Sequence, residues 1–281
     1  MKHILRYFAC ITCLAACLLF VSCGGSIFVS ELSINGNELS KQAFLTQIAE
    51  RESYSGIGFT SEQFYNVKAQ KLTSKECENS DNSHNYASIT GCVMLSSLAY
   101  RTKFRFSVNA ENYSSTAQGS DIAKSESSGQ LTYVNGELYS KVKYKNYQKT
   151  DGAVAKKENV VYSCSDASDI TNSLIDTTTI ISLVENFDVN ALISSLSVYS
   201  FDSERYYKIT DGYAFSFDGE TKIQFAITYM EGSTRVKTLS LYVSSGQNNV
   251  NDEKTVIRVD INASTSKRIS APSNKDKYKM R

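Results

Sequence analysis

The sequence has no tryptophan, one proline (Pro272) and only two histidines among its 281 residues. The two are His3 and His84, and only His84 lies beyond the first 25 residues. A single histidine argues against metal sites built from several histidines and against Ser-His-Asp or Cys-His catalysis. The motifs HExxH, GxSxG and GxGxxG are absent. Excess charge is missing too, because 30 Lys and Arg stand against 29 Asp and Glu. We therefore expect no cofactor, no metal, no nucleic-acid partner and no enzymatic activity.

The residues that are abundant point to β structure. The chain has 18 tyrosines and 13 phenylalanines, together with many Ser, Thr and Asn residues. Tyrosine and threonine suit the half-wet surfaces of pleated sheets. This composition is typical of an extracytoplasmic β protein and differs from that of a disordered chain.

The first 25 residues have the layout of a secretory signal peptide. Lys2 and Arg6 make the start basic, and an apolar run follows from Tyr7 to Val21. That run is shorter than the roughly 20 residues that a membrane-spanning helix needs, although an uncleaved membrane anchor is the alternative interpretation. Either interpretation places the rest of the chain outside the cytoplasmic membrane.

The end of this segment resembles the lipobox of bacterial envelope lipoproteins. Phe20-Val21-Ser22-Cys23 carries the resemblance, although the family usually has leucine where Phe20 stands, and Leu14-Ala15-Ala16-Cys17 is an alternative match. The resemblance implies cleavage before Cys23 and attachment of palmitate-type acyl chains to that cysteine. It implies a lipoprotein held on a bacterial membrane by two or more chains.

The sequence predicts four regions. They are a lipoprotein signal peptide (1–22), a lipidated tether (23–36), a single β-rich extracytoplasmic domain (37–266) and a flexible basic tail (267–281). We expect a first helix over 37–51, capped by Asn37 or Ser40, and a shorter one over 188–196. Strands are expected over 103–110, 131–147, 158–163, 205–210, 213–217, 221–229, 235–243 and 255–263. Segment 64–73 is ambiguous between strand and helix, and its alternation of apolar and polar residues favours a strand. Polar loops are expected over 74–87 and 113–128.

Two segments define the faces of the predicted sheet. In 103–110, Phe104 and Phe106 alternate with basic and polar residues, which indicates one buried and one wet face. In 131–147, Asn135-Gly136 predicts a two-residue hairpin turn that pairs Tyr133 with Leu138. The opposite face of that hairpin is rich in lysine and is either solvated or able to bind an acidic surface. Near Asp218, a three-residue loop that pairs Phe215 with Ile223 would keep the apolar residues on one face.

Three cysteines follow the signal region, namely Cys77, Cys92 and Cys164. A Cys77–Cys92 disulfide would close a short polar loop and stabilise the fold by about 3 kcal/mol. The alternative is that these cysteines are not bridged. Cys164 would then remain as a small buried hydrophobe.

An early helix followed by long antiparallel strands resembles the half-open β-barrel lipoproteins of the LolA and LprG kind. The resemblance rests on element order, and no residue motif carries it. It implies an α+β, mainly antiparallel β fold, with a curved antiparallel sheet or half-barrel and a few helices, where a β-sandwich is the alternative. It also implies a concave apolar face that takes up lipid.

The sequence thus favours a membrane-anchored, non-enzymatic surface lipoprotein that binds a hydrophobic or amphiphilic, lipid-like ligand in the cell envelope. A surface interaction protein of the adhesin type is the first alternative, and an envelope hydrolase with paired carboxylates is the second. Seven aromatic residues would line a ligand cavity or, alternatively, form plain core. They are Phe104, Phe106, Tyr133, Tyr144, Tyr213, Phe215 and Phe225.

Overall fold

The fold was determined from a computed structural model of the whole chain. The structure describes residues 29–52, 63–76, 82–95, 103–116, 121–166, 193–194, 196, 201–232, 236–246, 252–264 and 268–280. The predicted signal peptide and Cys23 lie outside these residues, as do Cys77 and most of the predicted second helix.

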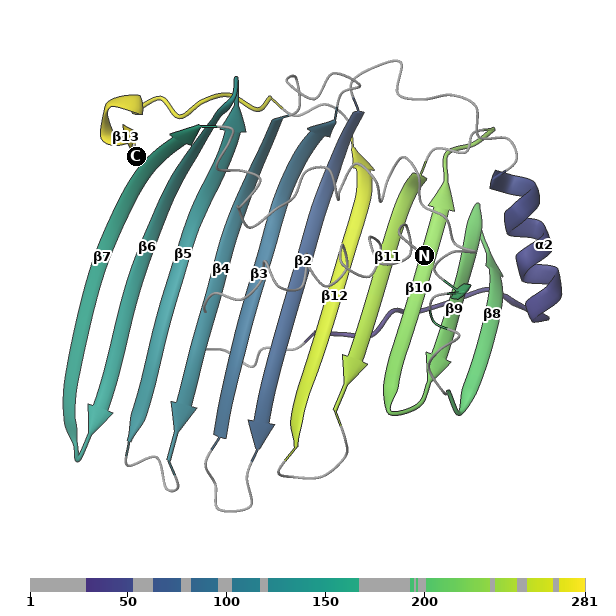
Figure 1. Cartoon of the computed structure of the whole chain (residues 1–281), viewed down its shortest axis with the longest axis horizontal. Coiled ribbons are helices and arrows are strands. Elements are labelled where there is room, and N and C mark those ends of the chain that lie inside the picture. The colour runs from purple at the N-terminus through teal and green to yellow at the C-terminus, as the bar shows by residue number, and fades with distance from the viewer. Residues whose placement is uncertain are drawn as a thin grey trace.

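The described chain forms one large open sheet, mainly antiparallel, with a helix at one end (Figure 1). Its thirteen strands follow the order β1-β8-β9-β10-β11-β12-β2-β3-β4-β5-β6-β7-β13. The predicted mainly antiparallel, curved-sheet fold is confirmed, and the described strands do not divide into the two sheets of a sandwich.

Two meanders make up the sheet, and the pairing of β12 with β2 joins them. The first comprises β2 (Gln63–Glu76), β3 (Asn82–Leu95), β4 (Lys103–Ser115), β5 (Ile122–Val134), β6 (Glu137–Thr150) and β7 (Ala153–Asp166). The second comprises β8 (Ser203–Ile209), β9 (Gly212–Asp218), β10 (Thr221–Tyr229), β11 (Val236–Ser245) and β12 (Glu253–Ser264). The strands of the first meander are longer than we predicted, and both predicted polar loops, 74–87 and 113–128, are largely strand.

The first helix is shorter than predicted. Helix α2 spans Lys41–Glu52, whereas Asn37–Leu39 forms the short strand β1 on the edge of β8. Ser40 caps the helix, since its Oγ accepts a hydrogen bond from the Ala43 amide at 3.2 Å. Ser40 is one of the two residues that we predicted as the N-cap.

One row of side chains shows how the sheet separates its two faces. Residues that lie opposite each other on successive strands form a row across all strands except β13. The row contains no charged residue and no Ser, Thr, Asn or Gln. The row is Leu39, Tyr206, Phe215, Phe225, Leu241, Val259, Ala69, Ile89, Val108, Gly129, Val142 and Val161. At about 4.8 Å per strand, it extends roughly 53 Å. We call this side of the sheet the apolar face.

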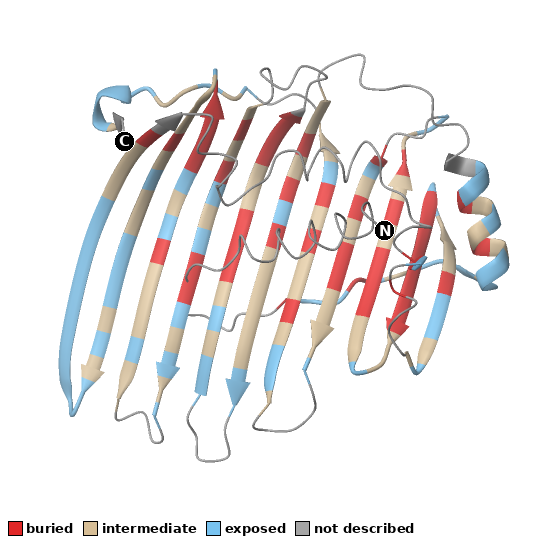
Figure 2. Cartoon of the chain, viewed as in Figure 1, coloured by how far each residue is buried: buried red, intermediate tan, exposed pale blue. Residues whose placement is uncertain are grey.

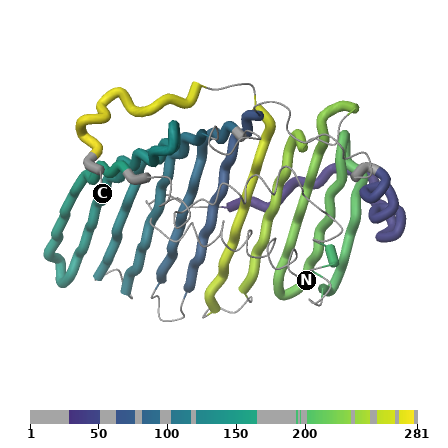
Figure 3. The backbone as a smooth tube through the Cα atoms, turned by 45° about the horizontal axis from the view of Figure 1, so that its top comes forward, coloured from purple at the N-terminus to yellow at the C-terminus, as the bar shows by residue number. Residues whose placement is uncertain are grey.

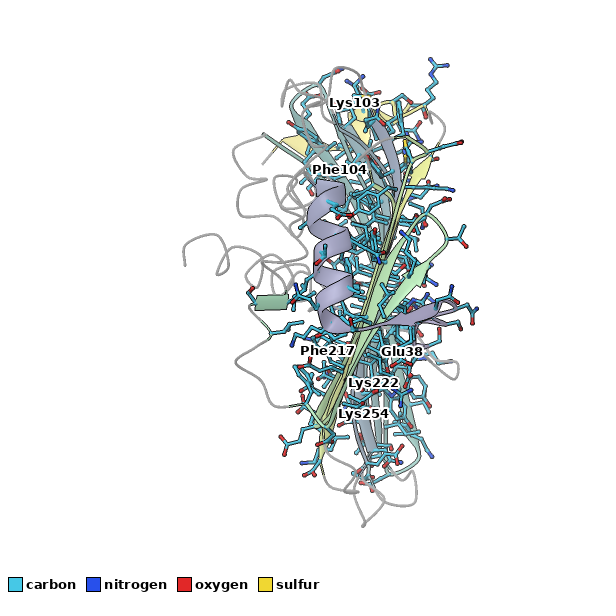
Figure 4. All side chains as sticks on the ribbon, turned by 90° about the vertical axis from the view of Figure 1, so that its right-hand side faces the viewer. Glu38, Lys103, Phe104, Phe217, Lys222 and Lys254 are labelled. Atoms are coloured by element: carbon cyan, nitrogen blue, oxygen red, sulfur yellow. The ribbon has the colours of Figure 1, made fainter. Side chains whose placement is uncertain are left out.

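The opposite side is the polar face. A neighbouring row on it reads Gln224, Tyr242, Arg258, Gln70, Ser88, Asn109, Ser128, Lys143 and Val160. In the edge-on view of Figure 4, α2 lies on the same side of the sheet as Phe104 and Phe217, and Lys222 points to the other side. The main hydrophobic core therefore lies between α2 and the apolar face.

The segment that follows the predicted anchor site is packed on the polar face. Val29 and Leu32 contact Tyr242 and Val256. The Arg258 guanidinium donates to the Ser30 carbonyl at 2.9 Å, and Lys222 pairs with Glu31 at 2.6 Å. Part of the predicted tether, residues 29–36, is therefore bound to β10, β11 and β12.

The C-terminal residues do not form the free basic tail that we predicted. Residues 268–280 run along one end of the strands of the first meander toward β7 (Figure 3). The short helix η4 (Lys275–Lys277) leads into β13 (Lys279–Met280), which pairs in parallel with Ser163 and Cys164. Tyr278 packs edge-on against Tyr139 and Tyr162 at centroid distances of 5.5 and 5.3 Å. These aromatic contacts hold the segment on the sheet, although its basic charge alone suggested that it would be solvated.

The predicted Asn135-Gly136 hairpin is confirmed in turn and register. Asn135 and Gly136 have φ values of 56° and 83°, and Tyr133 lies opposite Leu138. This left-handed pair of conformations is the one that a two-residue turn between twisted strands requires. A second turn of the same kind, Asp151-Gly152, joins β6 to β7 with φ values of 49° and 83°.

The register predicted near Asp218 is wrong by two residues. Phe215 lies opposite Phe225 and not opposite Ile223, which pairs with Phe217. A shift of two keeps every side chain on its face, so the apolar alternation that we used could not detect it.

Gly91 offers a test of how tightly β3 and β4 pack. It lies opposite Phe106, and a Cβ atom added to it would stand 2.1 Å from the Arg105 carbonyl oxygen and 2.9 Å from the Phe106 ring. We expect Gly91→Ala to lower the free energy of unfolding by about 1–3 kcal/mol through overpacking. Urea unfolding followed by tyrosine fluorescence measures it. Ser107→Ala, at an exposed position of β4, is the control and should change stability by less than about 0.5 kcal/mol.

Candidate functional site: the two faces of the sheet

All seven aromatic residues predicted to line a ligand cavity lie on the apolar face. Six of them are buried, with exposed fractions from 0% for Phe106 to 9% for Tyr133. Tyr144 differs, because 44% of it is exposed. The six buried residues fall into two groups on different parts of the sheet, and Tyr144 belongs to neither.

The first group lies beneath helix α2. The Phe44 ring from the helix lies 6.0 Å from that of Tyr213 and 6.4 Å from that of Phe215, both in edge-on geometry. Phe225 stacks on Phe215 at 5.2 Å, and the Tyr213 hydroxyl donates to the Gln47 carbonyl at 3.2 Å. These three predicted lining residues, Tyr213, Phe215 and Phe225, are helix-packed core.

The second group lies on β4 and β5, away from the helix. Phe104 packs against Phe106 at 5.0 Å and stacks on Tyr133 at 5.4 Å. Five strand spacings separate β4 from β10, or about 24 Å. Tyr144 is not part of this group, because it lies six residues along β6 from Leu138, the partner of Tyr133, or about 20 Å away, where the apolar face is exposed. We call Phe104, Phe106 and Tyr133 the far aromatic cluster.

A polar clamp attaches the start of α2 to β8. Lys41 donates to the Glu204 carboxylate at 2.8 Å, and the Tyr206 hydroxyl donates to the same oxygen at 2.7 Å. The Lys41 hydrogen bond lowers the pKa of Glu204, and that of Tyr206 lowers it further. Burial raises the pKa of Tyr206, to which the hydrogen bond with Glu204 adds. The clamp therefore favours an ionised Glu204 beneath the helix.

The polar face carries a network of alternating charges that the sequence analysis missed. Its centre is Glu111 on β4, whose side chain is fully buried. The His84 Nε2 atom lies 2.7 Å from Glu111 Oε1, and Lys124 Nζ lies 3.5 Å from Glu111 Oε2. Lys124 also pairs with Glu126 at 3.2 Å, and Glu126 pairs with Lys145 at 2.9 Å.

His84 is therefore not a solvated loop residue. It lies on β3, its side chain is 27% exposed, and its ring stacks on Tyr113 at 5.0 Å. The ring and Lys124 flank a carboxylate that would be costly to bury alone. In sequence the histidine and its glutamate stand 27 positions apart, and only the strand register brings them together.

An open hollow of about 620 Å³ lies beside this network. Glu126, Lys145 and Tyr147 contribute to its wall from β5 and β6, and β7 adds Lys156 and Glu158. The full lining is Lys124, Glu126, Lys145, Asn146, Tyr147, Lys156, Lys157 and Glu158. Its walls are charged and hydrophilic, so it suits a polar partner better than a lipid chain.

Glu111 and Glu126 lie directly opposite each other, and Lys124 bridges them. Paired carboxylates of a glycosidase need substrate or water between them. Here an ammonium group occupies that position. Among the described residues, no group of three or more His, Cys, Asp or Glu side chains is arranged to hold a metal ion.

The two described cysteines are buried, Cys92 on β3 and Cys164 on β7. Cys77, the predicted partner of Cys92, lies outside the described residues. Its neighbour Glu76 pairs with Asn82, at the far end of β3 from Cys92. At about 3.3 Å per residue, that end is roughly 33 Å from Cys92, whereas a disulfide joins Cα atoms less than about 7 Å apart. These positions argue against the predicted Cys77–Cys92 bridge.

Comparison with known proteins adds little. No protein-family model and no curated protein matches the chain. Among solved structures, it has a likeness to a porin-like protein from Bacteroides uniformis, with 9% identity over 70% of this chain and 97% of the other, and a TM-score of 0.12. A likeness of that size supports no argument about fold or function. In the described part of the chain, no helix is long and apolar enough to cross a membrane.

The buried carboxylate should matter more than exposed charges on the same face. We expect Glu111→Ala to lower the free energy of unfolding by roughly 2 kcal/mol, because His84 and Lys124 lose the acceptor between them. Glu158→Ala is the matched control, since Glu158 is 54% exposed and pairs with Lys143 at 2.7 Å. It should cost no more than about 1 kcal/mol. Equal losses in urea titrations would contradict the central role of Glu111.

The clamp on α2 predicts a pH dependence. Because the folded-state pKa of Glu204 is lowered from 4.5, its contribution to stability is complete above that value and is lost as pH falls through the folded-state pKa. We expect wild type to be more stable than Glu204→Gln at pH 7 and the difference to shrink as pH falls below about 4.5. Thermal unfolding of both proteins from pH 7 to pH 3 measures this. A constant difference across that range would rule out the clamp.

Proposed function

We propose that the protein is a lipid-anchored envelope protein that binds a hydrophobic or amphiphilic, lipid-like ligand on the apolar face of its sheet. The unbroken apolar row across twelve of the thirteen strands carries the proposal. A face of this width must be covered by helices, by another sheet or by a ligand. Among the described residues, the cover comprises α2 and the helical residues Ile193 and Leu196, which belong to the main core.

Within that face, we assign the ligand to its exposed part on β6, around Tyr144. The α2 end is already packed, because Phe44 and Ile48 are fully buried against it. The far aromatic cluster, about 24 Å from this helix-packed end, is closed as well, since Tyr133 is its most exposed ring at 9%. Tyr144 is 44% exposed, and together with Val142 in the next row of the same face it provides apolar surface that an acyl chain can contact.

The position of the N-terminal segment supports a site beside the membrane. Val29 is fixed on the polar face of β10–β12 and lies six positions after Cys23, with five residues between them. A chain of that length spans at most about 20 Å. Lipid on Cys23 would hold the sheet close to the bilayer from which a ligand would come.

The hydrogen-bonded and ionic groups of the polar face favour a second candidate function, a surface interaction protein. The charged hollow of about 620 Å³ beside the Glu111 network is open and hydrophilic. A polar protein or polysaccharide would suit this surface, whereas a lipid would suit the opposite one. The two candidates thus differ in the face that they use.

One pair of variants separates the two faces. Tyr144 and Tyr147 lie on the same strand, with Tyr144 on the apolar face and Tyr147 on the polar face beside Lys156. We expect Tyr144→Glu to weaken phospholipid binding about fivefold, because an acyl chain on this part of the apolar face would desolvate the new charge. Tyr147→Glu should leave lipid binding unchanged.

The measurement is native mass spectrometry on the chain from Gly24 onward, which keeps every described residue. Wild type should carry a mass that organic solvent removes, and should take up added phospholipid. Equal binding by both variants would exclude the apolar face around Tyr144 as the ligand site. A wild-type mass without any adduct, even with added phospholipid, would refute lipid binding altogether.

A further inference from the structure

The outer edge of β7 is open over most of its length. On its inner side β7 pairs with β6 throughout, whereas on its outer side β13 pairs only with Ser163 and Cys164. No other described strand pairs with β7. Every residue from Ala153 to Val160 is exposed, and Figure 2 shows this as a pale blue band along the strand.

The turn at Asp151-Gly152 determines which backbone groups face outward. In a two-residue hairpin the residues that flank the turn, here Thr150 and Ala153, exchange hydrogen bonds with each other. Every second residue of β7, counted from Ala153 itself, therefore forms its backbone hydrogen bonds with β6. The residues between them direct their N–H and C=O groups away from the sheet. They are Val154, Lys156, Glu158 and Val160.

This edge also carries exposed apolar side chains. Val154 and Val160 are 54% and 39% exposed, and both lie on the polar face. An exposed strand edge with unpaired backbone groups and apolar side chains is a template for another strand. Between the valines lie Lys156 and Glu158, of opposite charge.

We propose that two copies of this chain pair through their β7 edges, antiparallel and about a two-fold axis at Lys157. In this register Val154 lies opposite the partner's Val160, and Lys156 lies opposite the partner's Glu158. The symmetry repeats both pairs on the other side of the axis. All four pairs join residues whose backbone groups face outward, so they are the hydrogen-bonded pairs of the new ladder.

The neighbouring registers lack this complementarity. A shift of two residues in one direction places Lys156 opposite itself and Val154 opposite Glu158. A shift in the other direction places Glu158 opposite itself and Lys156 opposite Val160. Like charges directly opposite each other destabilise a strand pair, whereas opposite charges and β-branched pairs stabilise it. A shift of one residue would set outward-facing backbone groups against inward-facing ones.

The position of β13 agrees with the same register. The partner's first strand residue after its turn, Ala153, would lie opposite Val161, two residues before Ser163, where β13 begins to pair with β7. The partner strand thus fits the open part of the edge and ends where β13 occupies it. On the apolar face Lys157 meets its own copy, which opposes pairing and keeps the dimer from being very tight.

Cysteine cross-linking tests the symmetry axis in the full chain, in the cells that express it. Lys157→Cys places two thiols across a non-hydrogen-bonded pair with Cα atoms about 4.5 Å apart, within disulfide range. The matched control is Asn159→Cys, since each copy of that residue would lie about 13 Å from the other. We expect a disulfide-linked dimer on non-reducing gels for Lys157→Cys and not for Asn159→Cys or wild type.

Charge exchange tests the register without any covalent bond. Glu158→Lys places like charges opposite each other and should weaken dimerisation about tenfold, whereas Lys156→Glu with Glu158→Lys restores the pairs and the dimer. Sedimentation velocity of the full chain in detergent measures both. A monomeric wild type, no rescue by the double variant, or equal cross-linking at both cysteine positions would overturn the proposal. Cross-linking of Lys157→Cys to a different protein in place of its own copy would overturn it too.

Discussion

The pairing of β12 with β2 is the constraint on which the rest of the structure depends. It joins two meanders that are separated in the sequence, and it sets Val259 opposite Ala69 and Ile261 opposite Val67. Because side chains alternate strictly along a strand, a slip of one residue here would put the apolar residues of the two meanders on opposite faces. Neither face would then be continuous. A single apolar face, the packing of α2 on it and a polar face that binds both terminal segments all require this one register.

The sequence predicted the strands whose two faces differ strongly in polarity. Phe104 and Phe106 alternate with Lys103 and Arg105, and the strand there begins where we expected it. Asn135-Gly136 fixed a turn and a register together, because few residues tolerate positive φ at both turn positions. Segment 113–128 misled us for the opposite reason. Its strands carry only serine and alanine on the apolar face, and Tyr113 and Ile122 lie on the polar face, so no apolar alternation marks them.

The candidate sites were harder to predict than the fold. The aromatic residues were placed correctly on one face, but periodicity alone could not show that α2 packs on Phe215 and not on Phe104. The Glu111 network was not predictable at all. His84 and Glu111 meet only because β3 and β4 pair in one register, and nothing in the local sequence of either residue marks a buried ion pair. We predicted a free C-terminal tail because the segment is basic, and we gave no weight to Tyr278, whose ring packs on Tyr139.

The arrangement of the terminal segments connects the two proposals. The N-terminal segment lies on the polar face at β10–β12, whereas the open edge of β7 stands six strand spacings from β12, or about 29 Å away. A lipid on Cys23 would therefore hold one end of the sheet near the membrane and leave the β7 edge accessible. Pairing through that edge would continue both faces across two copies, with the two anchors at the outer parts of a doubled sheet. The far aromatic cluster of each copy would lie away from the two-fold axis, because Tyr133 lies in the row of Ser165, eight residues along β7 from Lys157.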